Sequence, residues 1–205
     1  MNLQTSVSQN LLFPVFLKAE EMNILLVGAG YVGNEKASGL LKNSPNTRLK
    51  IIAEAVSKEV AALKVQFPQI TIQQKLFEEK DLEGVQVLIL AINNRPLSAH
   101  IREVAHKLNI LVNVADTPDL CDFYLSSVVQ KGNLKIAVST NGKSPTVAKR
   151  IRELLEDILP DEIDELLENI NRIRDSVKGD FAEKVKKLNE LTASLSKKGG
   201  DIQPK

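Results

Sequence analysis

Apolar residues in the first half of this sequence gather in short continuous runs, and the stretches between them have the spacing of helices. The runs cover residues 23–27, 49–53, 70–72, 85–91 and 110–114, and the helix-compatible stretches cover 34–42, 57–66 and 97–108. Short apolar runs are typical of strands buried on both faces of a sheet. Because strands that alternate with helices build a parallel sheet, this half of the chain predicts an α/β fold.

The pattern changes after Asp116. Two more strands are expected at 123–129 and 134–139, joined by a hairpin-like turn, and helices are expected from Ser144-Pro145 to Pro160, at 163–177 and at 181–195. The apolar run at 11–17 is interpreted as one further strand. We therefore expect a sheet domain at 1–115, strands and a turn at 116–145, a C-terminal helical region at 146–198 and a polar tail at 199–205.

Composition excludes several classes of function. Of 205 residues, 43% are hydrophobic and 26% charged, which is typical of a soluble globular chain. The 27 basic and 26 acidic residues give a net charge of +1, so no global field attracts nucleic acid or an anionic membrane. The single cysteine and two histidines supply no metal-ligand cluster. Without a stretch of about 20 apolar residues, a cytoplasmic protein is expected.

A glycine-rich motif follows the first apolar run. In Gly28-Ala-Gly-Tyr-Val-Gly33, the first glycine permits a tight turn, the second lets a pyrophosphate approach the backbone, and the third lets the helix pack on the strand. Glu54 ends the next strand, 21 residues beyond Gly33, where a carboxylate accepts ribose hydroxyls and repels a 2′-phosphate. The motif predicts a Rossmann-like sheet that binds NAD rather than NADP. The candidate residues are Gly28, Ala29, Gly30, Tyr31, Val32, Gly33 and Glu54.

Both assignments have structural alternatives. The glycines can serve the turn of a Rossmann domain that binds no nucleotide, and Glu54 can be a solvated loop carboxylate.

A second candidate site lies at Ser139–Pro145, where a strand turns into a helix. Residues 130–152 contain six basic side chains and no acidic one, and hydroxyls and backbone amides gather at the helix start. This composition predicts a surface for a ligand with several carboxylates, although an ordinary capped turn explains the same residues. The candidates are Ser139, Thr140, Asn141, Gly142, Lys143, Ser144, Lys149 and Arg150.

Asp116 is the candidate catalytic residue. It directly follows a parallel strand, at the carboxyl edge where open α/β sheets bind ligands, and its carboxylate can act as a general base or a metal ligand. Asp119 and Asp122 are expected to cap turns, and His100 and His106 to be surface or packing residues.

Several motifs in one order resemble a known family. They are Phe13-Pro-Val-Phe-Leu17, the glycine motif with Lys36, Ala91-Ile-Asn93-Asn94, Asn113-Val-Ala-Asp116 with Pro118–Phe123, and Ile136–Pro145 leading into Ala148–Glu153. Together they resemble the precorrin-2 dehydrogenase/sirohydrochlorin ferrochelatase family, the N-terminal module of siroheme synthases. The resemblance covers roughly residues 13–159.

The resemblance implies an NAD-dependent oxidation of precorrin-2 to sirohydrochlorin in siroheme biosynthesis and, in bifunctional members, insertion of ferrous iron. Both substrates are tetrapyrroles with eight carboxylates, which suits the basic segment. The family's shared aspartate matches Asp116, and Asn93 falls at the cofactor site. Members are homodimers that exchange the segment after the Rossmann domain, so residues 116–145 become a β dimerisation segment.

This chain also departs from the family. Glu54 stands where many members have proline, Ile92 and Asn94 replace the usual residues, and the sequence after Pro160 has no histidine, cysteine or methionine to bind iron. Two other functions stay open: an NAD-sensing regulatory module without catalysis, and a chelatase that has lost dehydrogenation.

Overall fold

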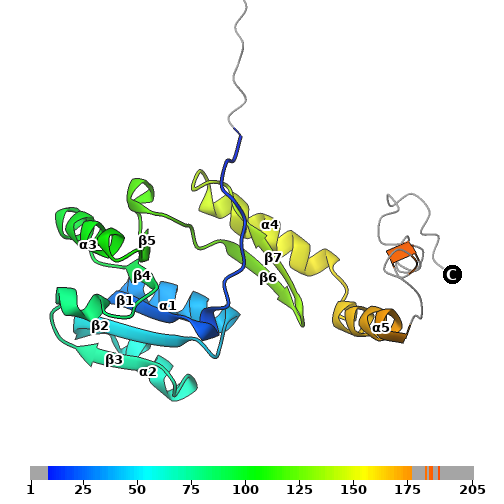
Figure 1. Ribbon diagram of the computed structural model, residues 1–205, viewed down its shortest axis with the longest axis horizontal. Coiled ribbons are helices and arrows are strands. Elements are labelled where there is room, and N and C mark those ends of the chain that lie inside the picture. The colour runs from blue at the N-terminus through cyan, green and yellow to red at the C-terminus, as the bar shows by residue number, and fades with distance from the viewer. Residues whose placement is uncertain (1–8, 177–182, 184, 187–188, 190–205) are drawn as a thin grey trace, which may run out of the picture. The chain divides into compact units, whose positions relative to one another are not determined.

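The structure is a computed structural model that describes residues 9–176 together with residues 183, 185, 186 and 189 (Figure 1). The chain divides into two compact units. One comprises Met1–Val128 and Ala137–Ile151, and the other comprises Val129–Ile136 and Arg152–Lys205.

Five parallel strands form the sheet of the first unit, in the order β3-β2-β1-β4-β5. The strands are β1 (Asn23–Ala29), β2 (Arg48–Val56), β3 (Thr71–Gln74), β4 (Val87–Leu90) and β5 (Leu111–Val114), and the helices between them are α1 (Tyr31–Asn43), α2 (Lys58–Gln66) and α3 (Arg95–Lys107). The predicted α/β, Rossmann-like fold is confirmed. Strand order reverses beside β1, and this switch point is where open α/β sheets bind ligands.

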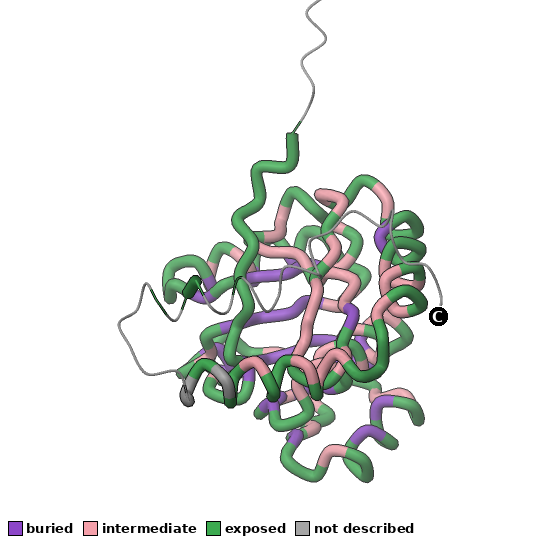
Figure 2. The backbone as a smooth tube through the Cα atoms, turned by 90° about the vertical axis from the view of Figure 1, so that its right-hand side faces the viewer, coloured by how far each residue is buried: buried purple, intermediate pink, exposed green. Residues whose placement is uncertain are grey.

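Core side chains lie on both faces of this sheet, and its central strands are largely buried (Figure 2). Alternate side chains of β1 point to opposite faces, so Leu26 joins one cluster and Leu25 the other, and both are fully buried. Helices α1 and α2 cover the first face through Leu41 and Val60, and α3 covers the second through Ile101. Burying each of these large side chains contributes about 1.5–3 kcal/mol.

A two-stranded hairpin and two helices follow the sheet. Strand β6 (Ser127–Lys131) pairs with β7 (Leu134–Val138) across a turn at Gly132, whose φ of +53° favours glycine. Helix α4 (Pro145–Ile158) begins after Ser144, whose Oγ accepts the Val147 amide at 3.2 Å, as the Ser-Pro pair predicted. Helix α5 (Ile163–Ser176) follows. Short 3-10 helices lie at Ala19–Glu21, Glu79–Leu82 (η2) and Pro118–Leu120.

Two predicted strands need correction. The strand predicted at 11–17 is wrong, because these residues have no regular structure and are exposed, with Phe13 87% accessible. Strand β1 already has β2 and β4 on its two sides, so it offers this run no free edge. The strand predicted from 123 begins only at 127, since the Phe123 carbonyl accepts a side-chain bond from Asn113.

The predicted helix at 181–195 contains only four described residues, all helical, and the predicted tail at 199–205 lies outside the described residues. No helix in the described part of the chain is long and apolar enough to cross a membrane.

Candidate functional site

The glycine motif forms the turn between β1 and α1. Gly28 has a φ of +106°, and a Cβ there would collide with the Ala91 carbonyl of the chain leaving β4. A Cβ on Gly33 would collide with the Gly28 carbonyl, so this glycine lets α1 pack against the end of β1. Gly30 is different, because a Cβ there would meet nothing within 4 Å. The space beside Gly30 is therefore open to a ligand rather than filled by the protein.

A cavity of about 260 Å³ opens beside this turn, at the carboxyl ends of the central strands. Gly28 and Ala29 line it from β1, Gly30 lines it from the turn into α1, and Glu54 lines it from β2. Its apolar walls come from strands and from α3, through residues such as Ile52, Ile92 and Leu97. Tyr31, Val32, Gly33 and Asn93 do not line the cavity, although Tyr31 and Val32 begin α1, whose first amides have no partner within the helix.

One wall of this cavity was not predicted from the sequence. Lys75, Leu76 and Phe77 follow β3 and line the cavity with Glu54. Strand β3 is short and its residues are mostly exposed, so the hydrophobic pattern did not indicate that the residues after it belong to a site. The order of the strands could have predicted this wall, because the end of β3 lies beside the end of β2 in a Rossmann-like sheet.

These features fit a dinucleotide. The open space at Gly30 and the start of α1 suit a pyrophosphate, the apolar walls suit an adenine ring, and the Glu54 carboxylate suits ribose hydroxyls. Glu54 is exposed and its carboxylate makes no hydrogen bond or ion pair to any residue that the structure describes.

Asp116 lies in the turn after β5. Its φ is +56°, a left-handed conformation that aspartate adopts at a cost, and its side chain is exposed. Within the described chain, the Asp116 carboxylate has no hydrogen-bond or ion-pair partner. It does not line the cavity at the glycine motif. The carboxylate is thus available to a ligand at the carboxyl edge of the sheet.

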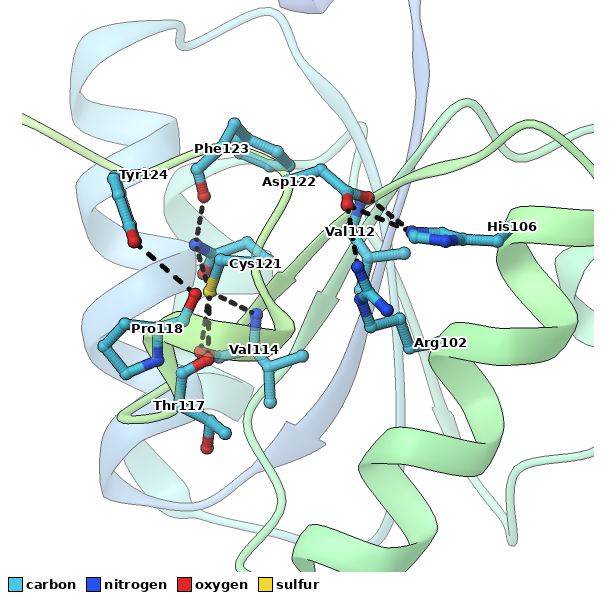
Figure 3. Close-up of polar contacts among 11 residues, drawn as sticks. Arg102, His106, Val112, Val114, Thr117, Pro118, Cys121, Asp122, Phe123 and Tyr124 are labelled. Atoms are coloured by element: carbon cyan, nitrogen blue, oxygen red, sulfur yellow. Dashed lines mark hydrogen bonds and ion pairs between the residues drawn. The ribbon is translucent and has the colours of Figure 1, made fainter. Parts of the chain in front are cut away.

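The loop that carries Asp116 is fixed by side chains further along it (Figure 3). The Asp122 carboxylate accepts the Val112 amide at 2.9 Å and lies 2.8 Å from His106 Nε2 and 3.4 Å from Arg102 Nη2, both on α3. The Cys121 Sγ accepts the Val114 amide at 3.2 Å. Burial raises the pKa of this thiol, so it stays protonated at neutral pH.

The two aspartates beside Asp116 therefore join separate elements rather than only capping turns. Asp119 makes a two-pronged ion pair with Arg95 at the start of α3, and hydrogen bonds from Arg95 lower the Asp119 pKa. His106 contacts Asp122, and His100 lies 3.3 Å from Glu79. The expectation that both histidines are surface or packing residues missed these pairs, since the partners are far away in sequence.

The turn at Ser139–Ser144 is closed by its own hydrogen bonds. Thr140 Oγ1 accepts the Ser144 amide at 3.2 Å, Ser139 Oγ accepts the Asn141 amide at 3.2 Å, and the Lys143 amide bonds the Thr140 carbonyl. Asn141 and Gly142 both have positive φ. These backbone amides are thus used within the turn, so a ligand here would meet mainly side chains.

Lys131 and Arg152, two of the six basic residues at 130–152, make ion pairs with acidic residues further along the chain. Lys131 Nζ donates to the Leu159 carbonyl at 2.6 Å and pairs with Asp161 at 2.7 Å, and Arg152 pairs with Glu156. Lys143, Lys149 and Arg150, the predicted cationic candidates, are exposed, and each of them also makes an interaction within the protein. No group of three potential metal-binding side chains occurs among the residues that the structure describes.

Comparison with known sequences finds two family matches along the chain. Residues 15–127 match the family described as "Putative NAD(P)-binding", and residues 131–158 match the family described as "Sirohaem biosynthesis protein central". The siroheme synthase of Vesicomyosocius okutanii subsp. Calyptogena okutanii is 37% identical over 169 residues, which are 82% of this chain and 36% of that protein. The siroheme synthase of Nitrosomonas europaea is 33% identical over 168 residues, 82% of this chain and 35% of that protein.

The chain thus spans about a third of the length of these siroheme synthases. Among solved structures, one described as SirC, precorrin-2 dehydrogenase, superposes with a TM-score of 0.69 at 22% identity. The superposition covers 91% of this chain and 93% of that chain. At this identity the likeness establishes a common fold.

Proposed function

Because the chain belongs to the family of the siroheme synthase N-terminal module, we propose that it is an NAD-dependent precorrin-2 dehydrogenase that forms sirohydrochlorin in siroheme biosynthesis. The observation that carries this proposal is the cavity at the switch point of the sheet, where Gly30 leaves open space and Glu54 presents an unpaired carboxylate. If the glycines served only the packing of the turn, open space beside Gly30 would not be needed.

In this function each part of the cavity has a task. The backbone at Gly28–Gly30 and the start of α1 bind the pyrophosphate, and Glu54 accepts the ribose hydroxyls. A 2′-phosphate beside Glu54 would place two anions together, so the site selects NAD over NADP. When bound, NAD supplies the acceptor for a hydride from the tetrapyrrole.

Oxidation of precorrin-2 removes a proton as well as a hydride, and Asp116 is the residue that we assign to accept that proton. Its exposed carboxylate has no partner in the described chain, which leaves both oxygens free for a ligand. Its left-handed backbone costs about 1–3 kcal/mol, a strain that proteins tolerate mainly at functional positions.

We assign the macrocycle carboxylates to the turn at Ser139–Ser144 and to Lys143, Lys149 and Arg150. The support is chemical: hydroxyl, amide and cationic side chains bind carboxylates, and no acidic residue interrupts residues 130–152.

We also propose a cytoplasmic homodimer that exchanges segments after the Rossmann domain. Helix α4 carries an apolar stripe of exposed side chains, at Val147, Ile151, Leu154 and Ile158, with a spacing that places them on one face. An exposed stripe of this kind marks a surface that another protein surface covers. A single free thiol, Cys121, suits a reducing compartment.

The test is an anaerobic assay of the purified chain with precorrin-2 and NAD, followed through the visible spectrum. Conversion to sirohydrochlorin that requires both protein and NAD supports the dehydrogenase. Ferrous iron added after oxidation then shows whether metal insertion exceeds the protein-free rate. NAD binding without any spectral change would overturn the enzyme and favour an NAD-sensing module, and metal insertion without NAD binding would indicate a chelatase.

The role of Asp116 is tested by Asp116→Asn, with the exposed Asp119→Asn as its control. We expect Asp116→Asn to bind NAD normally and to lose about 100-fold in turnover, the usual contribution of a general base. Full turnover with normal NAD affinity would remove Asp116 from the mechanism.

A further inference from the structure

Two residues of opposite charge lie near the carboxyl ends of neighbouring strands, at the rim of the cavity. Ala53 lies beside Gln74 in the parallel register of β2 and β3, and the Lys75 amide donates to the Ala53 carbonyl. Glu54 and Lys75 are the next residues along these two strands, and both line the cavity. A lysine in this position is within reach of the Glu54 carboxylate, so an ion pair between the two would be expected.

The structure shows another arrangement. The Lys75 ammonium bonds Asp81 Oδ2 at 2.9 Å and Glu78 Oε2 at 2.9 Å, and it makes no ion pair with Glu54. Asp81 and Glu78 belong to the segment around η2, after the cavity wall at Leu76 and Phe77. These two carboxylates therefore draw the lysine away from its neighbour on the sheet.

Asp81 is a fixed anchor for this lysine. Its side chain is only 5% exposed, and it also accepts the Glu78 amide at 3.0 Å and bonds Lys50 at 3.2 Å. Burial by itself would raise the Asp81 pKa, but hydrogen bonds from Lys75, the Glu78 amide and Lys50 outweigh it and lower the pKa. The Asp81 hydrogen bond in turn raises the Lys75 pKa, so both groups are charged at neutral pH.

We propose that Asp81, assisted by Glu78, is a specificity-determining residue for the nicotinamide cofactor, because it holds Lys75 away from Glu54. With Lys75 held, the Glu54 carboxylate is the unpaired charge at the ribose end of the cavity. It accepts the two hydroxyls of NAD and repels the 2′-phosphate of NADP. With Lys75 released, a cation would neutralise Glu54 and bind that phosphate.

This inference rests on the proposed function, since it assumes that the cavity binds a nicotinamide dinucleotide. The experiment is titration calorimetry of the full chain with NAD and with NADP. The quantity compared between variants is the ratio of the two dissociation constants, Kd(NADP)/Kd(NAD). The variants are Asp81→Asn, Glu78→Gln, Lys75→Met and the double variant Lys75→Met/Asp81→Asn. The matched control is Glu79→Gln, an exposed neighbour that contacts His100 rather than Lys75.

We expect the ratio to fall about tenfold in Asp81→Asn and about threefold in Glu78→Gln, because a charged hydrogen bond to phosphate becomes available. Glu79→Gln should leave the ratio close to that of the unmodified chain. Lys75→Met and the double variant should show no fall in the ratio, since both lack the cation that Asp81→Asn releases.

Two results would overturn this inference and leave the proposed function untouched. One is an unchanged Kd(NADP)/Kd(NAD) in both Asp81→Asn and Glu78→Gln, and the other is a fall of that ratio in Lys75→Met/Asp81→Asn as large as in Asp81→Asn. Glu78 is half exposed, so Glu78→Gln decides the question if Asp81→Asn does not fold. An unmodified chain that binds neither dinucleotide would overturn both this inference and the proposed function. Binding of NAD with no response in the variants would leave the proposed function standing.

Discussion

The sheet at residues 23–114 and the segment at 127–158 bury their apolar residues very differently. Six of the seven residues of β1 and all four of β4 are buried, and the helices around the sheet close both faces. Among the described residues after Ala115, only Val129 and Ala148 are buried. The first region encloses its own core, whereas the second carries an exposed apolar stripe on α4. The difference indicates that the sheet region folds around its own core, whereas the later segment leaves apolar side chains for another protein surface to cover.

The largest expected effect comes from breaking the turn at the end of β1. Gly28→Ala places a Cβ against the Ala91 carbonyl at a φ of +106°, and we expect it to lower the free energy of unfolding by about 3 kcal/mol. Gly39→Ala is the control, because this glycine lies inside α1 with nothing within 4 Å of a Cβ. It should stabilise the chain by about 0.5–1 kcal/mol. Urea unfolding measures both, and equal stabilities would show that the turn is not tightly packed.

A substitution on α4 should weaken dimerisation and leave the sheet region folded. Leu154→Glu puts a charge in the apolar stripe of α4. Burial of one leucine at an interface contributes about 2 kcal/mol, so its loss should weaken dimerisation about 30-fold. Asp157→Asn, exposed beside the stripe, should leave dimerisation unchanged. Sedimentation velocity over a concentration series gives the association constants, and NAD titration checks that the sheet is intact. Unaltered self-association in Leu154→Glu would exclude this stripe from the interface.

The loop between the two regions contains a matched pair of aspartates. Asp122→Ala leaves the Val112 amide and the His106 and Arg102 side chains without their carboxylate, so we expect a loss of about 1.5 kcal/mol in unfolding free energy. Asp119→Ala removes only an exposed ion pair and should leave the unfolding free energy almost unchanged. Urea unfolding of the two variants distinguishes the roles. Similar losses would mean that Asp122 is no stronger an anchor than Asp119.

The smallest effect concerns the thiol in the same loop. Because burial raises the Cys121 pKa, the thiolate population in the folded chain is small at pH 8 and grows only as pH rises further. We expect iodoacetamide to alkylate the native chain more slowly than the urea-unfolded chain at pH 8, with the difference narrowing above pH 9. Mass spectrometry of timed samples follows the reaction. Equal native and unfolded rates at pH 8 would show that the loop opens freely.

Short-range pattern predicted most of the sheet region. The strand at 23–27, the glycine motif and the capped start of α2 at Ser57 all have their signals within a few neighbouring residues, and the structure places each of them as expected. The run at 11–17 has the same apolar signal as a strand, yet it forms none. Strand formation needs a partner edge, which a local pattern does not contain.

Long-range pairing explains what sequence reasoning missed at the candidate site. Lys50 and Asp81 are 31 positions apart, and Asp122 and His106 are 16 apart, so no spacing rule links them. Glu54 was identified from its distance to the glycine motif, but Lys75 entered the site only through the register of β2 and β3. The turn at 139–144 was predicted as a helix start, while its internal hydrogen bonds followed from backbone angles that composition does not specify.

The central claim is that the cavity beside Gly30 holds the dinucleotide, and Gly30→Val tests it most directly. The new side chain points into open space, so folding should be unaffected while the pyrophosphate is blocked. Calorimetric titration with NAD should show one site per chain in the unmodified protein and no measurable binding in Gly30→Val, with unchanged unfolding midpoints. Equal NAD affinity in the two proteins, or no binding in either, would contradict the account.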